Sequence, residues 1–394
     1  MAFLNLFLPP YSSDFSGILS VLFDLGGLSI VHDASCCTKN YVDYEEPRWE
    51  RTRNSTFCSQ LRTMDAILGN DEKLIGHVLD TAEEIKPPFI AVLGTPVPSI
   101  TGTDMRGIGY EIENRTGIPT IGFESNGFES YDRGIEMAVN ALINKFSCPI
   151  ENKKEINPEK IRLNLIGVTP LDFVDKENVE MIRNYFNSNG FEVIVSIGMG
   201  YTMENLKKIS SADVTLAMTG ASVKPAQNLY RKYGIPYITG CPFGLKHASV
   251  LKERLRSVAL GNKYVERHEV NINTSKDRIL IIGEYVHAAS LREALYLNGC
   301  KKDIRVASMQ TSSKERFKTD DIYLKGEEDL IRLLQEKNYT KLVADRLILD
   351  MPQTAENIQK YEMVHPALSS NLYRNHAKKF LSVEFEDFMD EISK

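Results

Sequence analysis

Short apolar runs rich in valine and isoleucine recur along the 394-residue chain, and stretches with helical spacing of their apolar residues separate them. Buried parallel strands joined by crossover helices produce this alternation, because such strands are covered on both faces. The pattern therefore predicts an α/β protein with mostly parallel sheets. Its clearest strands are predicted at residues 89–94, 119–123, 163–168, 192–197, 214–218, 236–239, 278–283, 304–309 and 341–344.

Two charged stretches with weak strand signals, residues 151–160 and 262–277, divide this series of strands. A chain of 394 residues is also too long for a single core, at roughly 100–200 residues per domain. We therefore expect three Rossmann-like subdomains. They are predicted at 1–150, 151–265 and 266–394, the last with a closing amphipathic helix near 375–393.

Charge and composition favour a mildly acidic cytoplasmic protein. With 47 basic and 53 acidic residues the net charge is −6, so neither nucleic acid nor a membrane surface is expected as the main partner. The first ten residues are apolar but lack a basic region and end in Pro-Pro, which is atypical of a signal peptide. No apolar run reaches the length of about 18 residues that a membrane span needs. In the cytoplasm, cysteines are expected to be reduced thiols or metal ligands.

Turns that directly follow predicted strands are the first places to look for a binding site, because ligands of open parallel sheets bind beyond the carboxyl ends of the strands. No such turn forms a G-x-G-x-x-G fingerprint or a Walker A sequence, so nucleotide binding has no motif behind it. A tight backbone turn alone would also explain the glycines. The turns are residues 94–96, 167–170, 198–200, 219–221 and 283–284.

The vicinal pair Cys36-Cys37 follows His32-Asp33, so two thiols, an imidazole and a carboxylate share one short loop. Thiolates are the usual ligands of iron–sulfur clusters, whereas a structural zinc site would need a second Cys or His pair at fixed spacing. An isolated pair can equally be inert, and the spacing leaves both interpretations open. Three of the other cysteines are expected to be buried or in loops, and only Cys241 is expected to be accessible.

Residues 43–53 mix acidic and basic side chains with Trp49, the only tryptophan. A solvated loop or a contact between subunits would explain this mixture, since Trp and Arg are favoured at interfaces. Near the end of the chain, His365 precedes Ser369 and Ser370. A Ser/His pair suggests a hydrolase, but there is no G-x-S-x-G elbow, so helix capping is the expected use of these serines.

Six segments in one order along the chain resemble nitrogenase component 1 and its relatives, including dark-operative protochlorophyllide reductase. The first, VHDASCC at residues 31–37, is similar to a His-Gly-x-x-Gly-Cys loop and places Cys37 on a cluster-ligand position. The second, residues 55–74, is similar to a Ser/Thr-rich helix followed by Gly-Gly and Lys-Leu. The remaining segments are residues 95–105, 221–244, 278–295 and 365–370.

The chain also departs from that family. Relatives hold a bridging cluster with three cysteines per subunit, and only Cys37 is clearly kept. Pro96 stands at a second position, and the third falls near Ser12 or Ser13. The cysteine that holds the iron–molybdenum cofactor in catalytic nitrogenase subunits aligns with Met218, so no cofactor of that type is expected.

The resemblance implies three Rossmann-like subdomains around a central cleft that holds a small-molecule substrate. It implies an oxidoreductase subunit that accepts electrons from an ATP-hydrolysing iron protein. The subunit would pair with a copy of itself or with a second component 1-like chain, and Cys37 and Cys36 of each chain would share one 4Fe-4S cluster, with His32 or Asp33 in reserve. The residues expected to line the cleft or bind a cofactor are Gly94, Thr95, Pro96, Thr219, Gly220, Gly283 and His287.

Two alternatives remain at this stage. Loss of two family cysteines favours a non-catalytic partner or cofactor-assembly scaffold that binds a metallo-cofactor or small molecule without reducing it. The other alternative is a small-molecule binding protein with no metal. In either of the component 1-like interpretations, residues 48–53 are a candidate part of the subunit contact.

Overall fold

The computed structural model describes residues 5–394 apart from 53, 151–154, 263–276, 311, 313–316, 318–319 and 337. Within these residues the strands form three sheets, and every pairing of neighbouring strands is parallel. The predicted α/β class is confirmed. Residues 151–154 and 263–276, which belong to the two stretches that suggested subdomain boundaries, lie outside the described residues, as does Arg53.

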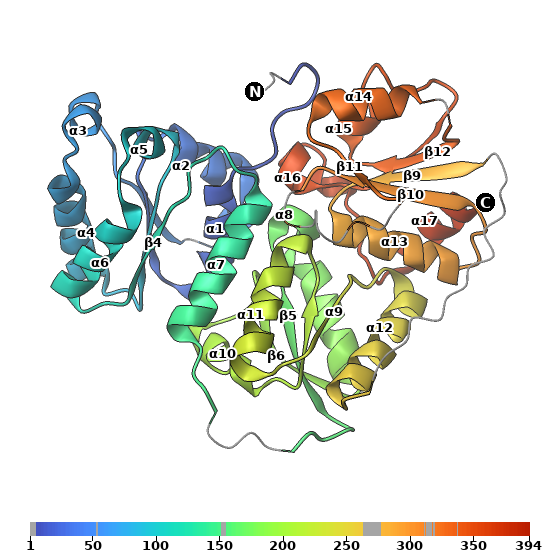
Figure 1. The fold of residues 1–394 in the computed structure, drawn as a ribbon, viewed down its shortest axis with the longest axis horizontal. Helices are drawn as coiled ribbons and strands as arrows, with labels where there is room; N and C mark the ends of the chain where they lie inside the picture. The colour runs from blue at the N-terminus through green and yellow to red at the C-terminus, as the bar shows by residue number, and fades with distance from the viewer. Residues whose placement is uncertain are drawn as a thin grey trace.

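We call each sheet with the helices that cover it a unit. The first unit lies at the left of Figure 1, in blue to teal, and its sheet has the order β2-β1-β3-β4. Its strands are β1 (Leu28–Val31), β2 (Ser55–Cys58), β3 (Ile90–Leu93) and β4 (Thr120–Phe123). Its helices are α1 (Asp14–Leu22), α2 (Cys36–Asn40), α3 (Thr63–Leu68), α4 (Asp71–Ile85), α5 (Pro96–Thr101), α6 (Met105–Thr116) and α7 (Tyr131–Phe146).

The second unit lies below the others in Figure 1, in green to yellow, with the sheet order β6-β5-β7-β8. Its strands are β5 (Ile161–Ile166), β6 (Phe191–Ile197), β7 (Val214–Ala217) and β8 (Tyr237–Thr239). Its helices are α8 (Pro170–Phe173), α9 (Lys176–Ser188), α10 (Met203–Lys207), α11 (Val223–Tyr233) and α12 (Gly244–Ala259).

The third unit lies at the right of Figure 1, in orange to red, with the sheet order β11-β10-β9-β12-β13. Its strands are β9 (Arg278–Ile282), β10 (Asp303–Ser308), β11 (Ile322–Tyr323), β12 (Lys341–Ala344) and β13 (Gln359–Glu362). Its helices are α13 (Tyr285–Leu297), α14 (Glu327–Gln335), α15 (Arg346–Leu349), α16 (Pro366–Ser369) and α17 (Val383–Ser393).

Each of the nine predicted strands is present, with ends that shift by a few residues. The structure adds β1, β2, β11 and β13, of which the last three lie at sheet edges and are only partly buried. Edge strands need no continuous apolar run, so the sequence pattern does not reveal them. Residues 55–58 form β2, so the helix expected at the start of the 55–74 segment is wrong there. The closing helix begins at Val383 rather than near residue 375.

The hydrophobic cores extend across the units. One cluster of buried side chains combines residues of the second and third units, for example Phe173 with Leu291, and another combines the first and second, for example Leu142 with Leu229. Because apolar surface between the units is removed from water, the three sheets form one packed body rather than independent domains.

Helices α1 and α7 cross at unusually close range because both carry glycine at the crossing. A Cβ at Gly134 of α7 would lie 1.8 Å from the carbonyl oxygen of Asp14, and a Cβ at Gly17 of α1 would lie 2.1 Å from that of Tyr131. Only residues without a side chain permit these backbones to approach so closely. The pair therefore fixes α7, whose first residue Tyr131 reaches the site described below.

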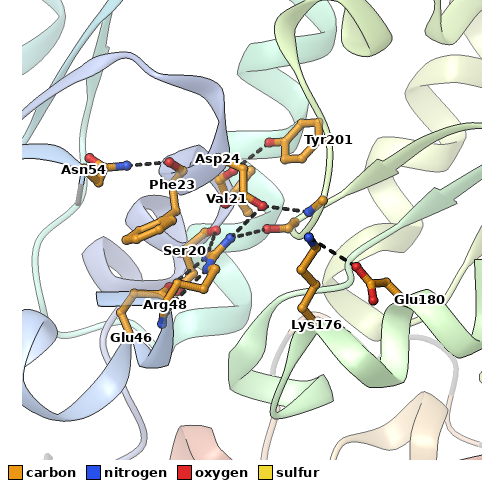
Figure 2. Close-up of polar contacts among 12 residues, drawn as sticks. Ser20, Val21, Phe23, Asp24, Glu46, Arg48, Asn54, Lys176, Glu180 and Tyr201 are labelled. Carbon is orange, nitrogen blue, oxygen red and sulfur yellow. Dashed lines mark hydrogen bonds and ion pairs between the residues drawn. The ribbon is translucent and has the colours of Figure 1, made fainter. Parts of the chain in front are cut away.

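Figure 2 shows how Arg48 joins the first unit to the second. Its guanidinium pairs with Glu46, donates to the Gly198 carbonyl oxygen at 2.9 Å and lies 3.3 Å from Asp24, while only 11% of its side chain is exposed. Asp24 in turn accepts a hydrogen bond from the Gly200 amide at 2.7 Å. For Arg48, the expected solvated loop or subunit contact is therefore wrong. A long-range contact within the chain uses this residue and fills the turn at 198–200.

In the part of the chain that the structure describes, no helix combines the length and apolar character that crossing a bilayer requires.

Candidate functional site

The sheet topology singles out three places for binding. In each unit the strand order reverses beside a central strand: between β1 and β3, between β5 and β7, and between β9 and β12. At such a reversal the crossover helices leave toward opposite faces of the sheet, which opens a crevice beyond the carboxyl ends of the two strands. The candidate residues from the sequence fall at these three positions, and the structure gathers them into two sites.

The first site, the cysteine edge, is the loop of residues 32–37 that follows β1. The Asp33 carboxylate organises it by accepting hydrogen bonds from the backbone amides of Ser35 at 3.0 Å and Cys37 at 2.9 Å. Ser35 has a φ of 128°, a conformation that a residue with a side chain rarely adopts, so the loop is held under strain. This arrangement turns the chain into α2 directly at Cys36.

The two thiols of the cysteine edge differ in exposure. Cys36 is exposed, while Cys37 is half-buried and packs against the core of the first unit. Burial raises the pKa of the Cys37 thiol to about 12, and the neighbouring Asp33 carboxylate adds to the rise. The free thiol therefore stays protonated at neutral pH, and binding of a metal there must release a proton.

Gly94, Thr95 and Pro96 lie at the cysteine edge and not at the second site. The Thr95 hydroxyl is fully buried and donates to the His32 carbonyl oxygen at 2.7 Å, which joins the turn after β3 to the loop after β1. Gly94 has no room for a side chain, since a Cβ would lie 2.4 Å from the Ser125 carbonyl oxygen. These three residues support the cysteine loop.

The second site, the junction, is where the turns after β7 and β9 meet. Glu284 connects them: its carboxylate accepts from the Gly220 amide at 2.8 Å and from the His287 amide at 2.9 Å. Gly220 belongs to the second unit and His287 to the third. The structure therefore brings together four of the predicted residues, Thr219, Gly220, Gly283 and His287, through a carboxylate between two turns.

A buried contact of three side chains, one from each unit, lies at the same junction. The Tyr131 hydroxyl at the start of α7 donates to Asp172 Oδ1 in α8 at 2.6 Å. His365, just before α16, places Nε2 at 2.9 Å from the Tyr131 oxygen and 3.2 Å from Asp172 Oδ1. The His365 amide and the Ser369 hydroxyl both donate to Asp345 Oδ2 at 2.8 Å. These bonds tie the three units directly to one another.

His287 stands in an aromatic surrounding. Its ring meets Phe173, Phe243 and Phe380 edge-on, with centroids 5.0, 5.6 and 5.8 Å away. This burial lowers the pKa of His287 to about 4, so the imidazole is neutral at physiological pH. Met218, at the end of β7, is fully buried in the same core.

Glu284 makes stability depend on pH. Burial, followed by the Asp172 charge, raises the pKa of Glu284 from 4.5 to about 7. A carboxyl group with a raised pKa stabilises the fold below about pH 4.5 and loses that contribution as pH rises through about 7. Glu284→Gln stays neutral, so between pH 5 and 8 its free energy of unfolding should improve relative to the unmodified chain by about 3 kcal/mol, at about 1.4 kcal/mol per pKa unit. Urea unfolding at several pH values measures this difference, and parallel pH profiles would contradict the assignment.

Several other expectations need correction. Cys241 is fully buried rather than accessible. Ser369 and Ser370 cap no helix, because their hydroxyls donate to Asp345 and to the Tyr44 carbonyl oxygen. Sequence reasoning did not single out Tyr131 and Asp172. Asp172 follows β5 closely, so the strand-end rule could have found it, whereas Tyr131 reaches the junction only through the crossing of α1 and α7.

Metal binding within one chain finds no complete site. Among the described residues, no group of three or more His, Cys, Asp or Glu side chains is arranged to hold a metal ion. At the cysteine edge a single chain therefore offers part of a ligand set.

Comparisons with known proteins agree with this architecture. Over its full length the chain matches a solved structure titled "Nitrogenase Cp1 at pH 6.5", covering 94% of that chain, with a TM-score of 0.70 and 14% identity. At this identity the likeness concerns the fold alone.

Curated relatives carry two kinds of name. The chain is 24% identical over 289 residues to the nitrogenase iron-molybdenum cofactor biosynthesis protein NifE of Methanosarcina barkeri, a match that covers 68% of this chain and 62% of the relative. It is 23% identical over 230 residues to a light-independent protochlorophyllide reductase of Chlamydomonas moewusii, covering 52% and 41%. The chain thus spans less than two thirds of the length of either relative.

The family description "Nitrogenase component 1 type Oxidoreductase" matches residues 13–280, which is more than half of the chain and includes the cysteine edge and the turn after β7. The three parallel sheets and the matched segment lead to one conclusion: the chain belongs to the nitrogenase component 1 type oxidoreductase family.

Proposed function

We propose that this chain is a component 1-type subunit that pairs with a second component 1-type chain and shares an iron–sulfur cluster with it at the cysteine edge. The observation that carries this proposal is the pair of thiols, one exposed and one half-buried, on a strained loop at the reversal point of the first sheet. Thiolates are the usual ligands of such clusters, and strained loops concentrate at functional sites.

Apolar side chains around the cysteine edge support a partner chain there. Helices α3 and α5 lie side by side and expose Ile67, Leu68 and Ile100 by 70, 71 and 75%. Phe57 of β2 is also exposed. Exposed apolar side chains gathered in one region mark interaction sites more often than single exposed residues do. A second chain that covers this surface would also supply the thiols that one chain lacks.

The residues of the edge fit a shared 4Fe-4S cluster in number and type. Cys37 and Cys36 of this chain would hold it together with thiols of the partner, and a protein-bound cluster of this kind supplies one-electron transfer. Asp33 holds the loop through its backbone amides, and both Asp33 and the depth of Cys37 oppose thiolate formation until metal binds. A homodimer and a pair with a different component 1-type chain both satisfy this arrangement.

For the whole complex, the proposed role is electron transfer from an ATP-hydrolysing iron protein, through the cluster, to a small-molecule substrate. A cofactor-assembly scaffold is the second candidate, because the M. barkeri relative is named as a cofactor biosynthesis protein. Mixing the complex with reduced iron protein and MgATP separates the two roles. Oxidation of the iron protein coupled to reduction of the cluster supports electron transfer, and its absence in a cluster-loaded complex favours the scaffold.

Cysteine variants test the cluster itself. We expect protein purified without oxygen to contain iron and sulfide and to show the absorbance and electron paramagnetic resonance signal of a 4Fe-4S cluster. Cys37→Ser should abolish these signals, because serine oxygen is a poor ligand for iron in such clusters. Cys148→Ser, which changes another exposed cysteine at a distant position in the chain, is the matched control and should keep them. Iron that persists in Cys37→Ser would remove this residue from the ligand set.

A further inference from the structure

We propose that the junction of this chain is a closed polar lock: Tyr131, Asp172 and His365 fasten the three units together and exclude an anionic metallocluster, so that the cysteine edge is where the chain holds its cluster. This inference rests on the proposed function for the cysteine edge and goes beyond it. It implies that a substrate or metallo-cofactor of the complex is bound outside the junction of this chain.

Direct contact between the units is the first reason. Tyr131, Asp172 and His365 come from different units, and their polar atoms lie within 2.6 to 3.2 Å of one another. Tyr131 is fully buried, Asp172 is 4% exposed and His365 is 7% exposed. A cleft at this point would have to separate these bonds. Hydrogen bonds to a charged acceptor in a buried setting are among the strongest that side chains make.

The charge of the junction is the second reason. Asp172, Glu284 and Asp345 bring carboxyl groups to it, and Asp132 lies close enough to affect the pKa of Tyr131. Among the described residues, no lysine or arginine forms a hydrogen bond or ion pair with any of these four side chains. A cluster built from sulfide and thiolate carries negative charge, and buried carboxylates without a cationic partner repel it.

Unpaired acceptors point the same way. Asp172 Oδ2 and Asp132 Oδ1 are buried without a hydrogen-bond partner among the described residues. Carboxylate oxygens in this state favour a proton, a water molecule or another hydrogen-bond donor as neighbour. Such a donor is small and opposite in polarity to a sulfide-rich cluster.

Backbone strain shows that the contact is specified. Val174, two residues after Asp172, has φ 67° and ψ −61° while its side chain is buried, and Ser370, just after the α16 turn that begins at His365, has φ 56°. Neither residue is glycine, so both conformations cost energy and persist only where surrounding contacts determine them. The strained turns thus flank the two sides of the lock.

Cluster uptake is the first test. The double variant Cys36→Ser, Cys37→Ser is incubated without oxygen with a synthetic anionic 4Fe-4S thiolate cluster, and bound iron is counted after gel filtration. We expect uptake equal to that of a protein without cysteine ligands. Uptake in the double variant that disappears when Asp172→Ala is added would place a cluster at the junction and overturn the proposal.

Hydrogen exchange is the second test and does not depend on a cluster. Tyr131→Phe and Asp172→Asn should speed amide exchange roughly tenfold or more at the start of α7, in α8 and in α16 together, since each change removes a bond to a charged acceptor. Tyr201→Phe is the matched control: it removes another buried tyrosine hydroxyl between the first and second units, bonded to the Val21 carbonyl oxygen, and should affect α1 but not α16.

The two tests separate the two proposals. If the unmodified protein takes up no cluster, the cysteine-edge proposal fails while hydrogen exchange still decides the lock. If Tyr131→Phe and Asp172→Asn both exchange like the unmodified protein in all three helices, the lock is wrong whatever the iron content. Iron content unchanged in Tyr131→Phe, together with faster exchange, supports both proposals.

Discussion

Arg48→Ala is expected to lower the free energy of unfolding by about 3 to 5 kcal/mol, the range for removing one member of a buried ion pair. The Arg48 side chain is 11% exposed and that of Glu46 is fully buried, so the variant leaves a carboxylate in the interior without its cation. It also leaves the Ser20 and Gly198 carbonyl oxygens without the donors at 2.6 and 2.9 Å (Figure 2). Urea unfolding followed by circular dichroism measures the change.

Arg115→Ala is the matched control. Arg115 pairs with Glu72 and Glu111, but all three side chains are at least 37% exposed. Ion pairs in water contribute at most about 1 kcal/mol. A loss in Arg48→Ala no larger than that in Arg115→Ala would show that the contact between the first two units does not depend on this arginine.

Gly134→Ala is expected to cost about 3 kcal/mol or more, because overpacking against backbone atoms cannot be relieved by a rotamer change. The added Cβ would lie 1.8 Å from the Asp14 carbonyl oxygen, so α1 and α7 would have to separate. Separation of these helices would also displace Tyr131 from Asp172, and hydrogen exchange at the junction should rise with the loss of stability.

Gly76→Ala provides the opposite outcome from the same substitution. Gly76 lies in α4, and a Cβ there would meet nothing within 4 Å. Alanine favours a helix over glycine by up to about 1 kcal/mol, so this variant should be slightly more stable. Equal effects of the two substitutions in thermal unfolding would contradict the close crossing of α1 and α7.

Sequence patterns predicted the central strands well, since a strand buried on both faces must be apolar whatever surrounds it. Edge strands escaped prediction for the same reason: β13 has the sequence QKYE and is only partly buried. At the site, the sequence directed attention to Cys36, Cys37 and the turns after strands. It could not show that Gly94 to Pro96 support the cysteine loop while Thr219 and Gly220 meet Glu284 at the junction.

Arg48 shows the limit of local reasoning. A charged segment with a tryptophan has the composition of a surface or an interface, and composition does not distinguish an interface between chains from one within a chain. Only the packing of the first unit against the loop at 198–200 reveals that Arg48 is buried.

The amino-acid sequence by itself determined the α/β class, the central strands, the family resemblance and the cysteine loop, because each depends on residues close together in the chain. The tertiary structure alone decided which turns meet, that Arg48 is internal, and that Tyr131, Asp172 and His365 are in contact. The physical reason is distance along the chain: His365 and Tyr131 are 234 residues apart, and no local pattern records a hydrogen bond that forms only after three sheets have packed.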